Sequence, residues 1–279
     1  MQLHPFDQAI ALTAQGGDRF LGHTSPAYWN MVGPFGGISA SVMLNAVMQH
    51  PSRLGEPVSL TVNYASGMAQ GPFTVSARPA RTNRSTQHWI VEMTQTGSAG
   101  VEETVLTATV LTAVRRETWG VSDTPMPVVP SPERAPVQAG FASMEWVKRY
   151  QILSVTGGLP TQWDGSVNSS EPASASLTQV WLRDDPPRPL DFPALAAYAD
   201  IFFPRIFLRR AHRVPVGTVS MTVYFHVSGS LLRDCGSTYV LGQARGQVFR
   251  DGFFDHSAQL WSASGTPLVT SQQIMYYKE

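Results

Sequence analysis

The chain has 279 residues, of which 43% are hydrophobic and 14% charged, with 20 basic and 20 acidic side chains. This length allows one large or two ordinary domains, and the balanced charge gives no electrostatic case for nucleic acid or an anionic membrane as a partner. A single cysteine, Cys235, excludes an intrachain disulfide; with neither a secretory signal nor a membrane-spanning run, a cytoplasmic location is expected.

Residues 38–49 predict the first long helix, after a short lead-in over residues 1–20. Apolar side chains recur there at helical spacing, directly after the segment GPFGG at 33–37. Gly36 and Gly37 allow a close approach by another backbone or a ligand, and the N–H groups of a helix start favour anions and carbonyl oxygens. Tight packing of a helix on a sheet would explain the same glycines, so both interpretations stay open.

Four strand-like segments follow this helix, at 59–66, 72–81, 87–95 and 103–114. Turn signals separate them, so the first 116 residues predict one helix followed by an antiparallel meander. Residues 117–140 are rich in proline and lack periodicity, which indicates a linker. We therefore expect an N-terminal unit over 1–116 and a C-terminal unit over 141–279.

The second half places one acid inside an apolar helix. Strands are expected at 146–155 and 177–183, separated by a polar loop over 157–176, and residues 190–203 then predict a buried helix. Asp191 and Pro193 are helix-start signals, and Pro204 ends or kinks the run. Asp200 lies late in this helix, where a carboxylate is costly to bury without a partner or a task. The alternative is a solvent-facing Asp200, or one paired with Arg205.

The strand series then returns at 218–229, 237–249, 253–263 and 267–277. Residues 59–67 (SLTVNYASG) match residues 220–229 (SMTVYFHVSG), with one extra residue in the second copy and an offset of 161 residues. Each copy follows a helix rich in small residues and precedes three further strands. A repeat of domain size indicates duplication of a whole unit.

Several common chemistries lack support in the sequence. It contains no G-x-S-x-G nucleophile elbow, phosphate-binding loop, dinucleotide fingerprint or zinc motif, so neither a metal nor another cofactor is expected. His226 lies in a predicted strand on the same face as Tyr224 and Thr222. This position is more typical of a structural histidine than of a general base.

Three segments resemble the type II acyl-CoA thioesterase family. They are WLR at 181–183 with LAAYADIFFP at 195–204, GTVSMTVYFH at 217–226, and GTPLVTSQQ at 265–273. One departure is a spacing between Asp200 and Pro204 that is one residue shorter than in the family. The resemblance implies an α+β double hotdog, in which two antiparallel sheets each wrap around a central helix and are fused into one continuous sheet. It also implies hydrolysis of acyl-CoA thioesters, in fatty acid metabolism.

The resemblance implies that Asp200, Thr218 and Gln273 together hold the attacking water. A carboxylate can act as general base, while Thr and Gln can orient the water or polarise the thioester carbonyl. Gln272 competes with Gln273, but neighbours on a strand face opposite sides, so only one should reach the site. Gly36 and Gly37 would supply backbone N–H groups. The first half lacks the trio, so one site per chain is expected.

The expected substrate is an acyl-CoA, and an acyl carrier protein remains open as the carrier. The expected apolar pocket walls are Ile38, Val42, Met43, Tyr198 and Phe202. A homodimer is expected because hotdog sheets have open edges. Two alternatives remain: a non-catalytic protein that binds acyl-CoA or serves a structural role, and, less favoured, a hydratase or dehydratase, whose Asp–His pair is missing here.

Overall fold

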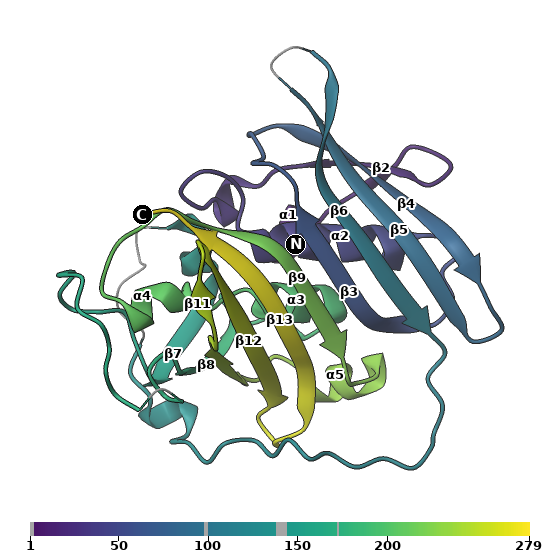
Figure 1. The fold of residues 1–279 in the computed structure, drawn as a ribbon. Coiled ribbons are helices and arrows are strands. Elements are labelled where there is room, and N and C mark those ends of the chain that lie inside the picture. The colour runs from purple at the N-terminus through teal and green to yellow at the C-terminus, as the bar shows by residue number, and fades with distance from the viewer. Residues whose placement is uncertain (1–2, 98–99, 138–143, 172) are drawn as a thin grey trace.

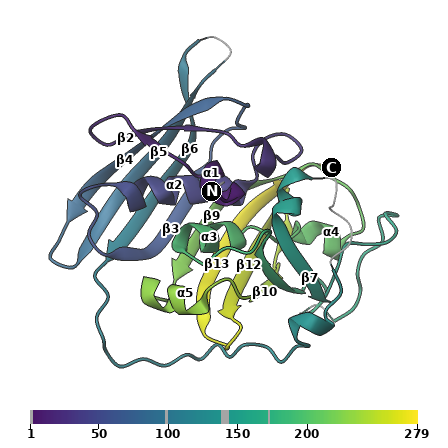
Figure 2. The same ribbon diagram turned by 180° about the vertical axis from the view of Figure 1, so that it is seen from behind.

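One antiparallel sheet runs through the whole molecule and carries two central helices on one face (Figures 1 and 2). The computed structural model describes residues 3–97, 100–137, 144–171 and 173–279. The strand order is β1-β2-β4-β5-β6-β3-β9-β13-β12-β10-β8-β7, with β11 paired to β12. Among the described residues, none of the helices has the length and hydrophobicity needed to span a bilayer.

Most strand bounds agree with the sequence predictions within a few residues, but the strand predicted over 218–229 ends at Phe225, which leaves His226 outside it, and the strand predicted over 237–249 is limited to 240–245, with 249–250 in a separate short strand. The strands are β1 (Thr13–Ala14), β2 (Arg19–His23), β3 (Glu56–Tyr64), β4 (Pro72–Thr82), β5 (Thr86–Thr96), β6 (Glu102–Ala113), β7 (Tyr150–Thr156), β8 (Thr178–Asp184), β9 (Val216–Phe225), β10 (Val240–Arg245), β11 (Phe249–Arg250), β12 (Phe253–Ser262) and β13 (Pro267–Tyr277). The α-helices are α1 (Pro5–Ala9), α2 (Gly36–Gln49), α3 (Phe192–Tyr198), α4 (Arg205–Arg209) and α5 (Gly229–Cys235), and 3-10 turns lie at Pro26–Tyr28, Pro132–Arg134 and Glu145–Arg149.

The two repeated segments are neighbours in the sheet. β3 pairs with β9 in antiparallel register, with Thr61 directly opposite Thr222 and their hydroxyl oxygens 3.0 Å apart. The same offset of 161 residues that relates the two sequence copies therefore relates this pair. Because each copy continues into its own set of strands on its own side, the pairing joins two similar halves into one sheet. This is the double hotdog fold, and the fold prediction is confirmed.

The central helices α2 and α3 pack directly against each other on one face of the sheet, the face toward the viewer in Figure 2. The buried Ser41 hydroxyl of α2 lies 2.7 Å from the carbonyl oxygen of Pro193 in α3 and 2.8 Å from that of Gly37. A Cβ on Gly37 would lie 2.8 Å from the carbonyl oxygen of Ala197, closer than real Cβ atoms approach. Small residues on both helices thus allow backbone contact, with the start of α2 beside the end of α3.

The helix predicted over 190–203 is shorter in the structure. Asp191 caps it as expected, since its carboxylate accepts from the N–H of Ala194 at 2.8 Å, but α3 ends at Tyr198. Asp200 therefore follows the helix instead of lying within it. The chain leaves α3 through hydrogen bonds from the N–H groups of Asp200 and Ile201 to the carbonyl oxygens of Ala197 and Tyr198, and Pro204 then caps the start of the separate helix α4.

The proline-rich segment is more closely attached than a free linker. Its described residues, 117–137, form one 3-10 turn and a single β-bridge from Val137 to Leu153. The indole N–H groups of Trp181 and Trp261 donate to the carbonyl oxygens of Pro130 and Thr124. Met126 and Val129 pack on these indoles, on the sheet face away from α3. The segment therefore stays attached to the molecule as it runs past the lower ends of the C-terminal strands (Figure 1). The predicted boundary at 140/141 lies outside the described residues.

Two further details differ from the sequence predictions. The strand expected over 146–155 begins only at Tyr150, because residues 145–149 form a 3-10 turn that buries Trp146. The short helix α5 was not predicted; the Ser228 side chain caps it by accepting from the N–H of Leu231. Neither difference alters the order of the sheet.

Candidate active site

Asp200 lies where the two central helices meet. It follows α3 directly, and its backbone N–H donates to the carbonyl oxygen of Ala197 at 3.1 Å. Its side chain is partly buried and points toward the start of α2, where a Cβ on Gly36 would lie 2.7 Å from Oδ2. The alternative that Asp200 pairs with Arg205 is wrong, because the Arg205 guanidinium donates instead to Phe203, Ser176, Thr178 and Ala244.

Gly36 and Gly37 begin α2 and face this carboxylate. Any side chain at Gly36 would collide with Asp200, and any side chain at Gly37 would collide with the backbone of α3. The first N–H groups of a helix lack intrahelical acceptors, and the positive end of the helix dipole lies with them. The two glycines therefore have both of the roles considered from the sequence. They let α2 pack closely on α3, and they let backbone N–H groups approach Asp200.

The surroundings of Asp200 shift its pKa in opposite directions. Burial raises its pKa from 3.8 to about 7, while hydrogen bonds with the Gln273 side chain and the Gly37 backbone hold it from rising further. Desolvation disfavours the charged carboxylate, whereas donors directed at it favour that form. A carboxyl group with a pKa near neutrality can both accept and release a proton at physiological pH.

Gln273, and not Gln272, faces the site. Gln273 is 2% exposed, and its Nε2 donates to the carbonyl oxygen of Ala199, next to Asp200, at 3.3 Å. Gln272 is exposed on the other side of β13, where its amide donates to Asp255. The strand alternation expected from the sequence thus separates the two neighbouring amides.

A bulge turns Thr218 to the same face as Gln273. The pairing of β9 with β13 shifts between Ile274 and Met275, so that Thr218 lies opposite Met275. Residues opposite each other share a sheet face, as do Gln273 and Met275, two apart on β13. Thr218 is half-buried, and the described residues offer its side chain no hydrogen bond. The structure therefore brings Asp200, Gly36, Gly37 and Gln273 together, with Thr218 on their side of the sheet.

Tyr64 is a site residue that the sequence reasoning missed. Its hydroxyl donates to the carbonyl oxygen of Gly36 at 2.9 Å, and burial together with the Asp200 charge raises its pKa well above 10.0. In the repeat, the equivalent position is Phe225. The sequence did contain a signal for this residue. The two repeated segments are similar, but only the first has a hydroxyl at this position, so the two halves differ in chemistry here.

A second buried carboxyl group lies nearby. Asp184 is fully buried opposite Tyr150 and interacts with the side chain of Tyr198. Burial raises its pKa to about 7, and the nearby Arg188 charge opposes this rise.

The expected pocket walls all belong to the interior. The five residues named from the sequence are buried in the main core cluster: Ile38, Val42, Met43, Tyr198 and Phe202. Their positions on and directly after the two central helices keep the surroundings of Asp200 apolar.

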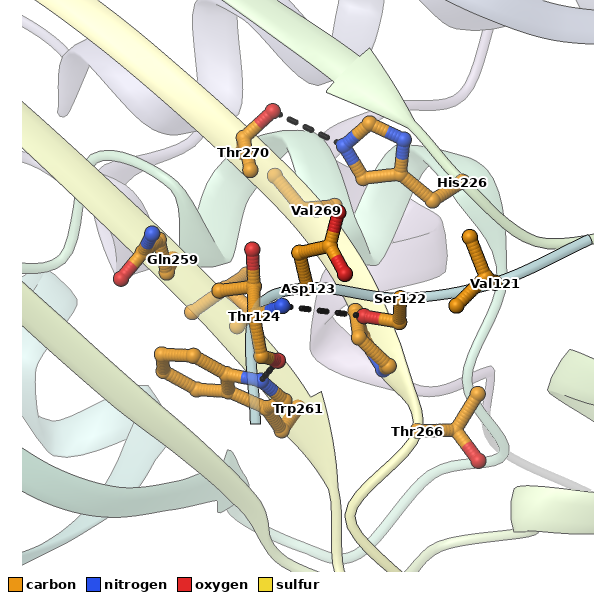
Figure 3. A pocket seen from close by; sticks show the side chains of 12 residues that line it. Val121, Ser122, Asp123, Thr124, His226, Gln259, Trp261, Thr266, Val269 and Thr270 are labelled. Atoms are coloured by element: carbon orange, nitrogen blue, oxygen red, sulfur yellow. Dashed lines mark hydrogen bonds between the residues drawn. The ribbon is translucent and has the colours of Figure 1, made fainter. Parts of the chain in front are cut away.

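A hollow of about 520 Å³ lies elsewhere, between the linker and the outer face of β12 and β13 (Figure 3). Polar side chains from Ser122, Asp123, Gln259 and Thr270 line it, and His226 bonds to Thr270 there at 2.8 Å. None of the residues predicted to hold water lines this hollow. His226 is thus on the opposite sheet face from Gln273.

Comparison with protein families identifies the chain. Residues 25–113 match the model of the acyl-CoA thioesterase N-terminal domain, and residues 125–277 match that of the C-terminal domain. The chain belongs to the acyl-CoA thioesterase family. In this family member, the residues that meet at Asp200 come from both matched regions, since Gly36 and Tyr64 lie in the first and Asp200 and Gln273 in the second.

Solved structures agree with the fold. A protein of unknown function with a hot dog fold from Alicyclobacillus acidocaldarius is 41% identical, covers 100% of this chain and 99% of its own, and has a TM-score of 0.89. A putative thioesterase II from Thermobifida fusca YX is 17% identical, with 100% and 99% coverage and a TM-score of 0.80. The acyl-CoA thioesterase II TesB2 from Mycobacterium marinum is 17% identical, with 98% coverage of both chains and a TM-score of 0.74. No curated protein matches this chain.

The donor set at Asp200 suits water and carbonyl chemistry. It combines a carboxyl group of raised pKa, a side-chain amide and the N–H groups of a helix start. Within the described part of this acyl-CoA thioesterase family member, no three His, Cys, Asp or Glu side chains are placed to hold a metal ion.

Proposed function

We propose that this protein hydrolyses acyl-CoA thioesters to the free acid and CoA, with Asp200 as the general base. The observation that carries the proposal is the position of Asp200: a carboxyl group with a pKa of about 7, between the Gln273 amide and the start of α2. A base whose pKa lies near the working pH is both available in its ionised form and strong enough to take a proton from water.

In the proposed reaction, ionised Asp200 accepts a proton as water attacks the thioester carbonyl carbon. The amide of Gln273 and the hydroxyl of Thr218 orient this water. Negative charge then develops on the carbonyl oxygen, and an N–H of Gly36 or Gly37 stabilises it. Collapse of the tetrahedral intermediate breaks the carbon–sulfur bond, and the proton held by Asp200 passes to the leaving thiolate of CoA. No covalent enzyme intermediate is needed, because a thioester is already an activated acyl group.

We propose aliphatic or aromatic acyl-CoAs as the substrate class, because the side chains buried around the two central helices are apolar. In this proposal the acyl group lies against Ile38, Val42 and Met43 from α2, Tyr198 at the end of α3, and Phe202. A buried acyl chain would also exclude bulk water, which strengthens the interaction of the N–H groups with the developing charge.

The test is a thiol-release assay over acyl-CoAs from acetyl to palmitoyl, with a phenylacetyl ester included. Asp200→Asn should lower kcat by at least 100-fold, because the neutral amide cannot accept the proton. Binding of the same acyl-CoA, measured by calorimetry, should stay within about threefold. Asp234→Asn, at an exposed position on α5, serves as the matched control and should retain parent activity. Binding without hydrolysis by the parent would instead establish a non-catalytic acyl-CoA-binding protein.

A further inference from the structure

His256 and Gln273 are direct neighbours across two strands. His256 in β12 lies opposite Gln273 in β13, and both side chains face the interior, with exposures of 1% and 2%. Side chains that lie directly opposite on antiparallel strands have Cβ atoms about 4.5–5.5 Å apart. His256 is therefore the nearest side chain on β12 to the amide that reaches Asp200.

Each of the two side chains carries one buried atom without a partner. These atoms are Nε2 of His256 and Oε1 of Gln273, which do not bond each other in this structure either, so a bond between them needs a small rotation of one side chain. A buried donor or acceptor left without a hydrogen bond costs about 1–3 kcal/mol. The Nε2 of Gln273 already donates to Ala199 at 3.3 Å, so its Oε1 needs a donor from another direction.

The surroundings of His256 keep its ring neutral and held in place. Burial lowers its pKa well below 6.5, and the nearby positive charge of Arg205 lowers it further. The ring packs edge-to-face against Phe202, with centroids 5.6 Å apart. A neutral imidazole carries one N–H, and a proton on Nε2 makes this nitrogen a donor.

We propose that His256 is a positioning residue, whose Nε2–H donates to Oε1 of Gln273 and fixes which way the Gln273 amide faces. This inference rests on the proposed function, in which Gln273 orients the water that Asp200 activates. With Oε1 held by His256, the NH₂ group must face Ala199 and Asp200. Without that donor the amide can flip, which turns its oxygen toward the Asp200 carboxylate.

The pKa of Asp200 depends on which end of the Gln273 amide faces its carboxylate. The Gln273 hydrogen bond helps to hold that pKa at about 7, so a flipped amide would let it rise. Among the groups near this pair, Tyr64 from β3 and Tyr150 from β7 stay neutral between pH 5 and 8.5, because their pKa values are raised well above 10.0. Asp184 from β8, with a pKa raised to about 7, titrates within this range, and Arg205 from α4, with a pKa lowered to about 9, begins to titrate at its upper end, so Asp184→Asn is the control and the acid limb is read below pH 8.

The first experiment compares His256→Phe with His256→Gln in the hydrolysis assay across pH 5 to 8.5. Phenylalanine keeps the ring against Phe202 but removes the donor, whereas glutamine restores an N–H donor. His256→Phe should raise the apparent pKa of the acid limb of kcat/KM by about half to one pH unit and reduce kcat about tenfold, with KM within threefold. His256→Gln should recover most of both. An unchanged acid limb in a folded His256→Phe protein would overturn the proposal.

A double-mutant cycle shows whether His256 acts through Gln273. In a Gln273→Ala background, His256→Phe should have little further effect on kcat, because the amide it positions has been removed. Independent, additive losses would assign His256 a purely structural role and would contradict the proposal.

A spectroscopic readout separates this inference from the proposed function. ¹⁵N NMR of the parent protein should show the neutral Nε2–H form of His256, with a hydrogen-bonded Nε2 signal that shifts in Gln273→Ala. This result is expected even if no acyl-CoA is hydrolysed, which would overturn the proposed function alone. A proton on Nδ1, or an Nε2 signal unaffected by Gln273→Ala, would overturn the role of His256.

Discussion

Asp200 experiences two opposing influences within a few ångströms. Loss of water around the carboxylate favours the protonated acid, whereas the donors from Gln273 and Gly37 favour the ionised form. The first influence is larger, so the pKa stands well above 3.8 but remains near neutrality. At pH 7 a substantial share of the protein therefore carries each form.

Hydrolysis should rise with pH as Asp200 ionises. Because a raised pKa delays loss of the proton, kcat/KM should increase tenfold per unit below pH 6 and level off above pH 8, with an apparent pKa of about 7. The measurement is a pH–rate profile of kcat/KM with one acyl-CoA.

Asp184 provides the control for this profile, since burial raises its pKa to about 7 as well. An Asp184→Asn protein that folds should keep the same acid limb, because Asp184 lies outside the proposed water-holding set. Loss of the limb in that variant, or a parent limb near pH 4, would refute the assignment of Asp200 as the base.

At the level of elements, strand alternation and one bulge decide which side chains reach the site. Gln272 and Gln273 have the same chemistry and adjacent positions, but β13 turns one to solvent and the other to Asp200. On β9, the bulge opposite β13 returns Thr218 to the inner face. A strict alternation from Met221 would have pointed Thr218 outward.

The two glutamines form a matched pair for mutation. Gln273→Ala should reduce kcat about 10- to 100-fold, because the attacking water loses an amide that orients it and the Asp200 carboxylate loses a hydrogen bond that stabilises its ionised form. Gln272→Ala should leave kcat within twofold. Both variants can be compared by thiol release and thermal melting. Equal losses of activity would contradict the assignment of Gln273 to the site.

At the level of the whole molecule, the site depends on the junction of the two halves. Gly36, Gly37 and Tyr64 come from the first half, whereas Asp200, Thr218 and Gln273 come from the second. Pairing of β3 with β9 and packing of α2 on α3 hold these groups in one place. Neither half by itself carries both the base and the N–H groups.

A homodimer stays a prediction, but the sheet edges that suggested it are small. β1 has two residues, and the linker bridges the free edge of β7 through Val137 and Leu153. The outer face instead exposes apolar side chains from three strands, at Ile90, Tyr224 and Ile274. We therefore expect a second copy to cover this face.

Light scattering should give about twice the chain mass of 30.5 kDa at micromolar concentration. Ile274→Lys should shift the mass toward that of one chain, because a lysine ammonium is costly to bury in an apolar interface. Ala263→Lys, at an exposed position at the end of β12, is the control. A parent protein of 30.5 kDa at all concentrations would contradict the dimer.

Much of this molecule follows from its sequence by itself. Apolar periodicity and turn residues determined the strands, the helix after Gly37 and the duplication, because these patterns act through local geometry and burial. The resemblance to thioesterases pointed to Asp200 and Gln273, which the structure places together. Local patterns did not determine the end of α3, the attachment of the linker, or the roles of Tyr64 and His256. Those depend on contacts between residues far apart in the chain, such as α2 with α3 and β12 with β13, and only the tertiary structure decides which groups such contacts bury together.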